Sequence, residues 1–560
     1  DGFFHILRII GTKYAISDGN VIPLIAPYFC RDFGYAINIF YQPLVTYIPL
    51  LISLFTNTNA TALKIFAGLT IILSGIFMYK FIYNVTKSKI ASFLAGLVYM
   101  AAPYHLTNIY ARYAMGEFAG MVFIPLVFLG LQNLFDGDGK KHYYISIGAI
   151  GLLLSHTITS FYTAIIGVIY ILYHVRAFKK KDVWRKCILN LIFTIAITLF
   201  FFLPLLEHNL SADYTIFSKE MMRTSTKYLP GKGTPIHEFF AIDTEKESLV
   251  VFEIGTPILL LMIVSLFSLK KMKKEYKDLY YISLILSLLS IYMSTDYFPW
   301  KLMPDVFGVI QYQWRMQTFF VLFSSVMIGI GIATILNNYI KDKNVRYIII
   351  TAITILVVIS SILSIEYMSA DRREYRSNTR ETDEIYEKEI LDKKVISHFS
   401  INRDYLPKNA TLKQSGYVNK REDRVYILSG NAIIENEEKH GLNLKFDVSN
   451  INNNTILELP YFYYLPYKIN LEKKDGTIKK LTFTESENGF IQIELNPEDE
   501  GKIVFEYSLT NIEKISYIIS ATSFAIFIIY LIKQKQVQKN ENDNIVERKE
   551  NENEKISTKL

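Results

Sequence analysis

The residues of this chain that could take part in chemistry are ionisable side chains at the edges of long apolar stretches. The first are Asp1, His5 and Arg8, at spacings of four and three residues, so that on a helix they share one face. A carboxylate in this position could accept a proton from a hydroxyl group, and an arginine could bind a phosphate. An amphipathic helix at the membrane interface, with a polar face that is merely solvated, explains the same pattern.

A second group combines Tyr104 and His105 with Arg112 and Glu117, across a polar segment between two apolar runs. Glu117 alone suits the first turn of a helix, where negative charge is favoured, and Arg112 could simply pair with it. That alternative leaves the density of Tyr, His and Arg side chains unexplained. We therefore predict that these four residues contribute to a binding or active site.

Two further groups interrupt apolar runs. His156 lies in a polar break, where a lone histidine is more often a hydrogen-bonded structural residue than a ligand. Arg315 ends the sequence QYQWR at 311–315; its aromatic neighbours suit the membrane interface, but the guanidinium could also bind a lipid phosphate through two parallel hydrogen bonds. Glu207 and His208 form a weaker fifth group.

Motifs of other enzyme classes are absent from the sequence. None of the five groups has the spacing of a zinc site, and there is no P-loop and no G-x-S-x-G elbow. The pattern requires no cofactor, and it leaves a divalent metal open.

The elements that must position these residues are membrane helices. Apolar residues make up 51% of the 560 residues and aromatic residues 14%, and mean hydropathy is positive at +0.21. A spanning helix needs about 20 mostly apolar residues. The sequence predicts eleven of them, at 61–83, 89–104, 117–134, 142–156, 159–176, 187–206, 250–269, 279–295, 317–338, 346–366 and 514–532.

Short basic clusters orient these spans. The net charge of +7 comes from Lys and Arg between apolar runs, where the positive-inside rule places them, and it does not indicate a nucleic-acid partner. The basic clusters fall at every second junction between spans only if the apolar tract 42–57 is a juxtamembrane or re-entrant helix, which Pro43 and Pro49 favour. All five groups then face outward. We expect a further span upstream of Asp1, which would place both termini inside.

The last quarter of the chain has a different pattern. Residues 367–513 are charged, contain β-branched segments and carry the turn signals Asp475-Gly476 and Asn488-Gly489, which indicate a β-sandwich-like domain outside the cell membrane. The tail 533–560 has no periodicity and is expected to be disordered and cytoplasmic. Strands are predicted at 424–428, 442–448, 455–459, 478–484, 490–495 and 502–508.

The resulting organisation is a multi-pass α-helical membrane protein with an extracytoplasmic β-sandwich-like domain inserted before the last transmembrane helix. Its predicted parts are a first outer loop at 1–60, a transmembrane domain of about ten spans at 61–366 with an outer loop at 207–249, the mostly-β domain at 367–513, a final span at 514–532 and the tail at 533–560.

Several short motifs resemble a known superfamily. Asp1-Gly-Phe-Phe-His5 with Arg8, and then Phe40-Tyr41-Gln42-Pro43-Leu44, resembles the first outer loop of GT-C glycosyltransferases. The Ala102-Pro103-Tyr104 motif, Arg112-x-x-x-Gly116-Glu117 and Ser155-His156 are similar to the bacterial membrane proteins called 6-pyruvoyl-tetrahydropterin synthase-related. The stretch 311–315 and the β-domain before a final helix resemble YfhO-like proteins.

The resemblance implies a function at the outer face of the bacterial cytoplasmic membrane. It implies a polyprenyl-phosphate-linked sugar as donor, and an envelope glycan, lipid or protein as acceptor. In this interpretation Asp1 is the general base, with His5 and Glu117 as further catalytic residues. The substrate would be bound by Arg8, Tyr41, Tyr104, His105, Arg112, His156 and Arg315. Two alternatives stay open: a lipid or polysaccharide transporter, and a non-catalytic envelope scaffold.

Overall fold

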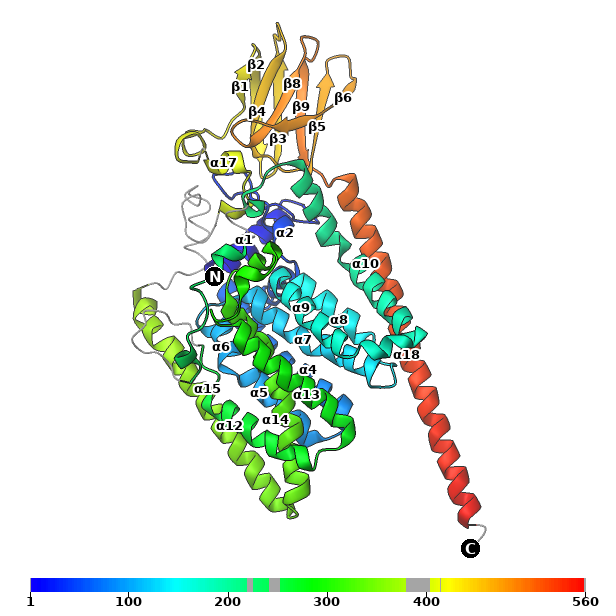
Figure 1. The fold of residues 1–560 in the computed structure, drawn as a ribbon. Coiled ribbons are helices and arrows are strands. Elements are labelled where there is room, and N and C mark those ends of the chain that lie inside the picture. Colours follow the sequence, from blue (N-terminus) through cyan, green and yellow to red (C-terminus); the bar gives the residue numbers. More distant parts are fainter. Residues whose placement is uncertain (1, 219–224, 241–251, 379–402, 413, 558–560) are drawn as a thin grey trace.

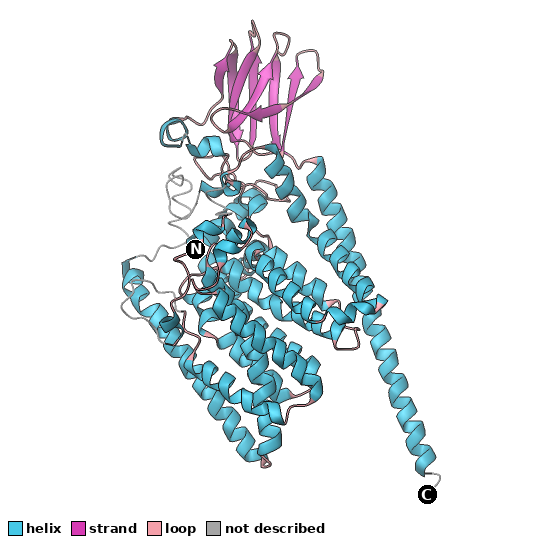
Figure 2. Cartoon of the chain, viewed as in Figure 1, coloured by secondary structure: helices cyan, strands magenta, loops and turns pink. Residues whose placement is uncertain are grey.

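A bundle of helices carries a β-domain at one end in the computed structural model, which describes residues 2–218, 225–240, 252–378, 403–412 and 414–557. The strands gather beyond one end of the bundle, next to α17, to α1 and α2, and to the adjoining ends of α10 and α18 (Figure 1). Figure 2 shows that helix and strand are segregated, with the strands confined to the C-terminal part of the chain. The fold is thus helical with one β-domain.

The helices of the described residues follow the apolar runs closely. Their bounds are α1 Gly2–Ser17, α2 Ile37–Phe40, α3 Leu44–Ser53, α4 Asn59–Thr86, α5 Lys89–Ala101, α6 Pro103–Tyr110, α7 Met115–Phe135, α8 Tyr144–Ser155, α9 Thr157–Tyr173, α10 Lys181–Ser211, α12 Thr256–Leu266, α13 Lys274–Met293, α14 Gln317–Tyr339, α15 Lys343–Asn378, α17 Lys408–Leu412 and α18 Asn511–Ser557. Short 3-10 helices, among them η8 Gln313–Met316, connect several of them.

Fewer helices are long enough to cross a membrane than the sequence predicts. By length and composition, six segments of the described residues qualify, namely Asn59–Thr86, Met115–Phe135, Lys181–Ser211, Gln313–Tyr339, Lys343–Met368 and Asn511–Asn540. A seventh is reached if α5 and α6, bent by 41° at Ala102, count as one. The expected spans at 142–156, 159–176 and 250–269 are the shorter helices α8, α9 and α12 with its 3-10 extension. The described residues thus form a helical chain with six or seven candidate membrane spans, as in a multi-pass membrane protein, instead of the eleven predicted.

The ambiguous apolar tract 42–57 forms the short helix α3. Its 10 residues rise by roughly 15 Å at 1.5 Å per residue, about half of the hydrocarbon core of a bilayer. Pro43 precedes the helix and Pro49 lies inside it. A helix of this length agrees with the prediction that the tract does not cross the membrane completely.

Two antiparallel sheets make up the β-domain. One has the order β1-β4-β8-β7 and the other the order β2-β3-β9-β5-β6. Tyr461 of the first sheet stacks on Phe505 of the second, with 4.6 Å between ring centroids, so the apolar faces of the two sheets meet as in a sandwich. The strands are β1 Tyr426–Ser429, β2 Ile433–His440, β3 Asn443–Ser449, β4 Thr455–Phe462, β5 Tyr467–Lys473, β6 Ile478–Leu481, β7 Phe483–Glu485, β8 Phe490–Leu495 and β9 Gly501–Tyr507.

The N-terminal loop inserts an aromatic side chain into this sandwich. Cys30, Arg31 and Asp32 all have positive φ values, of 55°, 62° and 68°, and this left-handed turn directs Phe33 onto the β-domain. The Phe33 ring packs edge-on against Phe490 at 5.1 Å and Phe462 at 5.7 Å. Residues of α1, of this loop and of both sheets consequently share one hydrophobic core.

The C-terminal tail continues the last helix. The expected disorder at 533–560 is replaced by helix as far as Ser557, in a 47-residue α18. The physical reason is that the tail extends a helix that is already nucleated, and its many Lys, Glu and Gln residues are good helix formers. Figure 1 shows this end of α18 projecting away from the bundle.

Candidate functional site

A buried carboxylate, Glu117, lies where three elements meet. It occupies the first turn of α7 and is 1% exposed. One carboxylate oxygen accepts a hydrogen bond of 2.7 Å from the Tyr104 hydroxyl group of α6. The other lies 2.9 Å from Nη1 of Arg112 and 3.4 Å from Nε of Arg315. Both oxygens are thus held, and the carboxylate keeps two guanidinium groups together.

Arg315 reaches Glu117 from η8, on the far side of the site. It is 7% exposed, and its Nη1 also donates to the Ile310 carbonyl at 3.2 Å and to Gln311 Oε1 at 3.1 Å. Nη1 lies 3.4 Å from the hydroxyl oxygen of Tyr162. The aromatic residues before Arg315 pack on each other: the Tyr312 ring stacks on the Trp314 ring, with 4.2 Å between ring centroids. These contacts fix the guanidinium in one orientation.

His156 lies against the same turn of α7. It separates α8 from α9, and its Nδ1 accepts from the Thr159 amide at 3.3 Å, so the histidine serves as the N-cap of α9. A Cβ added at Gly116 would come 2.8 Å from His156 Cδ2 and 3.1 Å from the Ser155 carbonyl oxygen. The glycine beside Glu117 therefore permits the close approach of this histidine.

Gly116→Ala tests that contact. We expect the alanine to lower the free energy of unfolding by about 1–3 kcal/mol, because overpacking forces His156 or the first turn of α7 to move. Gly68→Ala is the matched control, since a Cβ there meets nothing within 4 Å. Thermal unfolding of the purified protein checks both, and equal midpoints for the two variants would contradict the contact.

A second buried arginine lies on the other side of Tyr41. Arg8 of α1 is 1% exposed, and its guanidinium carbon lies 4.1 Å from the centroid of the Tyr41 ring. Its Nη2 donates to the Gln42 carbonyl at 3.3 Å and to the Thr46 hydroxyl. Nε and Nη1 have no hydrogen-bond partner among the described residues. Burial lowers the pKa of this guanidinium to about 10.

The unsatisfied guanidinium of Arg8 points to a ligand. A buried charge without an oppositely charged partner costs several kcal/mol, so proteins seldom keep one for stability. Among the described residues, the side chains with the largest electrostatic influence on Arg8 are Tyr41, Tyr405 and Tyr47, whose hydroxyl groups are neutral at neutral pH. An anion placed here would satisfy the two remaining donor nitrogens.

His5 completes this side of the site. Its ring centroid lies 5.7 Å from that of Tyr41 and 6.5 Å from that of Tyr113. Burial, together with the positive charge of Arg8, holds the pKa of His5 well below its ordinary value. The imidazole is therefore neutral at neutral pH and does not act as a counter-charge.

Tyr41 joins the two arginine groups. Charges on Arg8, Arg315 and Glu117 all act on its hydroxyl group, and the next residue, Gln42, donates through Nε2 to Thr157 Oγ1 beside the break at His156. We call Arg8, Tyr41, Tyr104, Arg112, Glu117 and Arg315 the arginine cluster. It contains three guanidinium groups and one carboxylate, a charge balance that favours an anionic ligand.

Other predicted site residues lie elsewhere. His105 is fully buried, and its Nδ1 lies 3.1 Å from the carbonyl oxygen of Tyr99, which suits a structural residue at the bend between α5 and α6. Glu207 accepts from Thr510 at 2.8 Å, and His208 accepts from the Leu465 amide at 3.2 Å. Both tie α10 to the β-domain. Asp1 is outside the described residues.

Some members of the site carry no pattern that a sequence analysis could use. Tyr162 lies within the apolar face of α9, and Gln311 lies in a loop with φ of +64°. Thr46 is one of many threonines in apolar runs. Their contributions depend on contacts with Arg8 or Arg315 across the fold. Of the contacts of these three residues, it is Arg8 and Arg315 that the sequence analysis had singled out.

An apolar groove of about 470 Å³ opens on the flank of the bundle between α12 and α15. Leu356, Ile359 and Leu363 line it from α15. At its α12 end, a Cβ at Gly255 would meet Pro103 at 3.2 Å, and the residue after Pro103 is the Tyr104 of the arginine cluster. Gly255, which lies between the lining residues Glu253 and Thr256, thus packs against the residue that precedes Tyr104.

Within the described ranges, no three His, Cys, Asp or Glu side chains gather closely enough to hold a metal ion.

Comparison with known proteins gives one distant relative. A protein of Lactococcus lactis subsp. cremoris (strain MG1363), described as an uncharacterized protein, is 26% identical over 579 residues, which cover 96% of this chain and 92% of that protein. No protein-family model matches the chain. The similarity extends over the helical bundle and the β-domain together.

Proposed function

We propose that this chain is a membrane-embedded transferase of the GT-C type, which takes a sugar from a polyprenyl-phosphate donor. The observation that carries the proposal is Arg8, a buried guanidinium with two donor nitrogens unsatisfied among the described residues, beside the Glu117-bridged pair of arginines. Phosphate is the anion that such a set of planar, charged donors recognises best. The sugar itself is inferred from the resemblance of the sequence motifs.

A lipid-borne donor is favoured by the position of the site. The apolar side chains of the flank groove come mainly from α15, and Gly255 beside it packs against Pro103, the residue before Tyr104 of the arginine cluster. An isoprenoid chain could therefore lie along α15 with its phosphate directed toward the arginines. The groove lies against Lys343–Met368, a candidate membrane span. A water-soluble nucleotide sugar would make no use of this surface.

The proposed reaction is an inverting substitution at the anomeric carbon. The acceptor oxygen forms a bond to that carbon as its bond to the phosphate oxygen breaks, and the hydroxyl proton passes to a carboxylate, for which we propose Asp1. Polyprenyl phosphate leaves with the bonding electron pair, and arginines stabilise the charge that develops on it. Glu117, with both oxygens already bonded, is assigned the role of positioning Arg112 and Arg315.

We also propose that the site and the β-domain face the outside of a bacterial cytoplasmic membrane. The basic segments Lys87–Lys89, Lys270–Lys274 and Lys341–Arg346 connect helices at the end of the bundle remote from the β-domain (Figure 1). Positive charge concentrates on the cytoplasmic side of membrane proteins. The β-domain would then bind or present the envelope glycan, lipid or protein that accepts the sugar.

The proposal is tested with the purified full-length protein in liposomes that contain a radiolabelled polyprenyl-phosphate hexose, with an envelope fraction as the source of acceptors. We expect label to move to the acceptor fraction, and Asp1→Asn to abolish this transfer without reducing expression or donor binding. Arg424→Gln is the control, because that side chain is about two-thirds exposed and pairs only weakly with Glu422.

Two results would reject the transferase. Translocation of labelled lipid across the bilayer without any sugar transfer would identify a transporter. Failure to bind the donor, together with unchanged behaviour of the Asp1 variant, would leave a scaffold whose β-domain is the functional part.

A further inference from the structure

Buried polar atoms without a partner lie on the α1 side of the arginine cluster. Besides Nε and Nη1 of Arg8, Nδ1 of His5 and the hydroxyl oxygen of Tyr113 have no hydrogen-bond partner among the described residues. The rings of His5 and Tyr113 are neighbours, with 6.5 Å between their centroids. An unpaired buried polar group costs free energy, so native proteins keep few of them. Several in one place indicate atoms that a ligand satisfies.

Tyr113 is held in this place by the turn between α6 and α7. Its φ of 49° lies in the left-handed region, which bulky residues seldom adopt. The turn is fixed because the Ala114 amide donates to the Asn108 carbonyl at 2.7 Å. The ring consequently lies against the start of α1, where a Cβ at Gly2 would come 3.6 Å from Tyr113 Cδ1. Backbone conformations of this kind concentrate at functional sites.

The packing of the Tyr113 ring does not use its hydroxyl group. The ring lies edge-on to Phe118, with 5.6 Å between centroids, and the ring carbons are what a side chain at Gly2 would meet. A phenylalanine would make the same contacts. The hydroxyl group is therefore available to bind a ligand.

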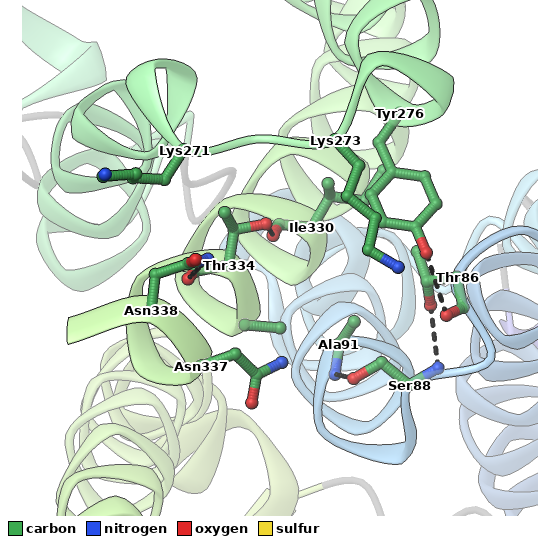
Figure 3. Close-up of a pocket in the computed structure, with 11 residues that line it drawn as sticks. Thr86, Ser88, Ala91, Lys271, Lys273, Tyr276, Ile330, Thr334, Asn337 and Asn338 are labelled. Carbon is green, nitrogen blue, oxygen red and sulfur yellow. Dashed lines mark hydrogen bonds between the residues drawn. The ribbon is translucent and has the colours of Figure 1, made fainter. Parts of the chain in front are cut away.

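The polar cavity at the opposite end of the bundle, about 150 Å³ in volume, gives a contrast (Figure 3). There the Tyr276 hydroxyl group donates to the Thr86 carbonyl at 3.2 Å. The Ser88 hydroxyl oxygen accepts from the Ala91 amide, also at 3.2 Å. These groups are satisfied within the protein and require no ligand, unlike the hydroxyl group beside α1.

The unsatisfied atoms beside α1 are of two chemical kinds. Arg8 offers only charged donors, which suit a phosphate. A phenol hydroxyl group and a neutral imidazole can each donate or accept a hydrogen bond, and burial keeps His5 neutral by holding its pKa well below the ordinary value. Groups of that second kind match a sugar hydroxyl, which also donates and accepts. A glycosyl phosphate carries both kinds of group side by side.

We propose that His5 and Tyr113 bind hydroxyl groups of the sugar whose phosphate is held by Arg8. The proposal rests on the transferase function and names the part of the site that receives the sugar. Tyr113 then determines specificity, because only the glycosylated donor reaches its hydroxyl group. The donor is consequently bound more tightly than polyprenyl phosphate, the product that must leave.

Binding is measured with the purified full-length protein in detergent, using polyprenyl phosphate and the polyprenyl-phosphate derivatives of glucose, galactose and mannose. At least one of the hexosyl lipids should bind more tightly than polyprenyl phosphate. Tyr113→Phe is expected to weaken binding of that lipid roughly three- to tenfold, as for the loss of a neutral hydrogen bond, and to leave the affinity for polyprenyl phosphate unchanged. Without ligand, its unfolding midpoint should be no lower than that of the unmodified protein.

Tyr99→Phe is the matched control. Tyr99 is a buried tyrosine of α5 whose hydroxyl group donates to the Met121 carbonyl at 2.7 Å. Its loss should lower the unfolding midpoint and leave both affinities unchanged. His5→Leu removes the other unpaired group and should discriminate between the lipids in the same way as Tyr113→Phe.

The outcomes separate this proposal from the transferase function. Equal losses of affinity for the hexosyl lipid and for polyprenyl phosphate would place the Tyr113 hydroxyl group at the phosphate and reject the sugar site. A lowered unfolding midpoint of Tyr113→Phe with both affinities unchanged would show that the hydroxyl group is structural. Equal binding of all the lipids to the unmodified protein would reject the sugar site alone, whereas binding of none would reject the transferase as well.

Discussion

Glu117→Gln is expected to lower the free energy of unfolding by about 3–5 kcal/mol, the usual cost of removing one partner of a buried ion pair. The amide preserves the shape and can still accept from Tyr104, but it leaves Arg112 and Arg315 facing each other without a counter-charge. Their side chains are only 15% and 8% exposed, so solvent cannot replace the carboxylate. Thermal unfolding of the purified protein in detergent measures the change.

Two comparisons make that result specific to the site. Glu438→Gln removes an exposed carboxylate from strand β2 and is expected to change stability by less than about 0.5 kcal/mol. Adding Arg112→Met to Glu117→Gln removes one of the unpaired cations, so the double variant should recover part of the loss. A double variant whose loss equals the sum of the two single losses would show that the residues do not interact.

Arg8→Met is expected to weaken ligand binding without lowering stability, the reverse of what is expected for Glu117→Gln. Without ligand, the methionine variant should be as stable as the unmodified protein or more stable, because a buried charge without an acidic partner is replaced by an apolar chain of similar length. The affinity for polyprenyl phosphate should fall roughly 10- to 100-fold, the equivalent of losing charged hydrogen bonds worth about 1.5–3 kcal/mol.

Binding and stability must be measured on the same preparation. Polyprenol, which lacks the phosphate, is the ligand control, and its binding should be unaffected by the substitution. Arg424→Met serves as the protein control, since that side chain is 64% exposed. Unchanged affinity for polyprenyl phosphate, combined with severe destabilisation, would show that Arg8 is a structural residue and that its unsatisfied nitrogens bind no anion.

The long apolar helices of the fold are predictable because their signal is local. α4, α7, α10, α14, α15 and α18 each coincide with a predicted span. The prediction fails where apolar runs are divided by polar breaks, because hydropathy does not reveal that α8 has 12 residues and ends at Ser155. A helix of that length is about 18 Å long and does not cross the hydrocarbon core by itself.

In the β-domain, the alternation of apolar and polar residues identified the strands that bury one face. β3, β4, β8 and β9 match predicted segments, while β2 and β5 were not predicted. β2 contains Glu435, Glu437, Glu438 and Lys439 and lies at the edge of its sheet, where little of it is buried and the apolar pattern is lost. β5 pairs with two strands and begins just after Pro466, a residue that discourages assignment of a strand.

The meeting of the polar groups at one end of the helices was easier to predict than the side chains that take part in it. Topology alone placed the polar groups at one end of the spans, and the structure brings Arg8, Arg112 and Arg315 around Tyr41 and Glu117. Which histidine lies near the arginines depends on how helices bend. His156 lies against Gly116, whereas His105, only 12 residues before Glu117, turns toward Tyr99.

The packing of Phe33 against both Phe462 and Phe490 has a mechanical consequence. The loop that carries this ring follows α1, the helix of His5 and Arg8, so a movement of the β-sandwich would also move the α1 side of the arginine cluster. If the β-domain holds the acceptor, as proposed, the acceptor would stay at a fixed distance from Arg8. The fixed spacing between the β-domain and the arginine cluster would then select acceptors by length, without a closing motion.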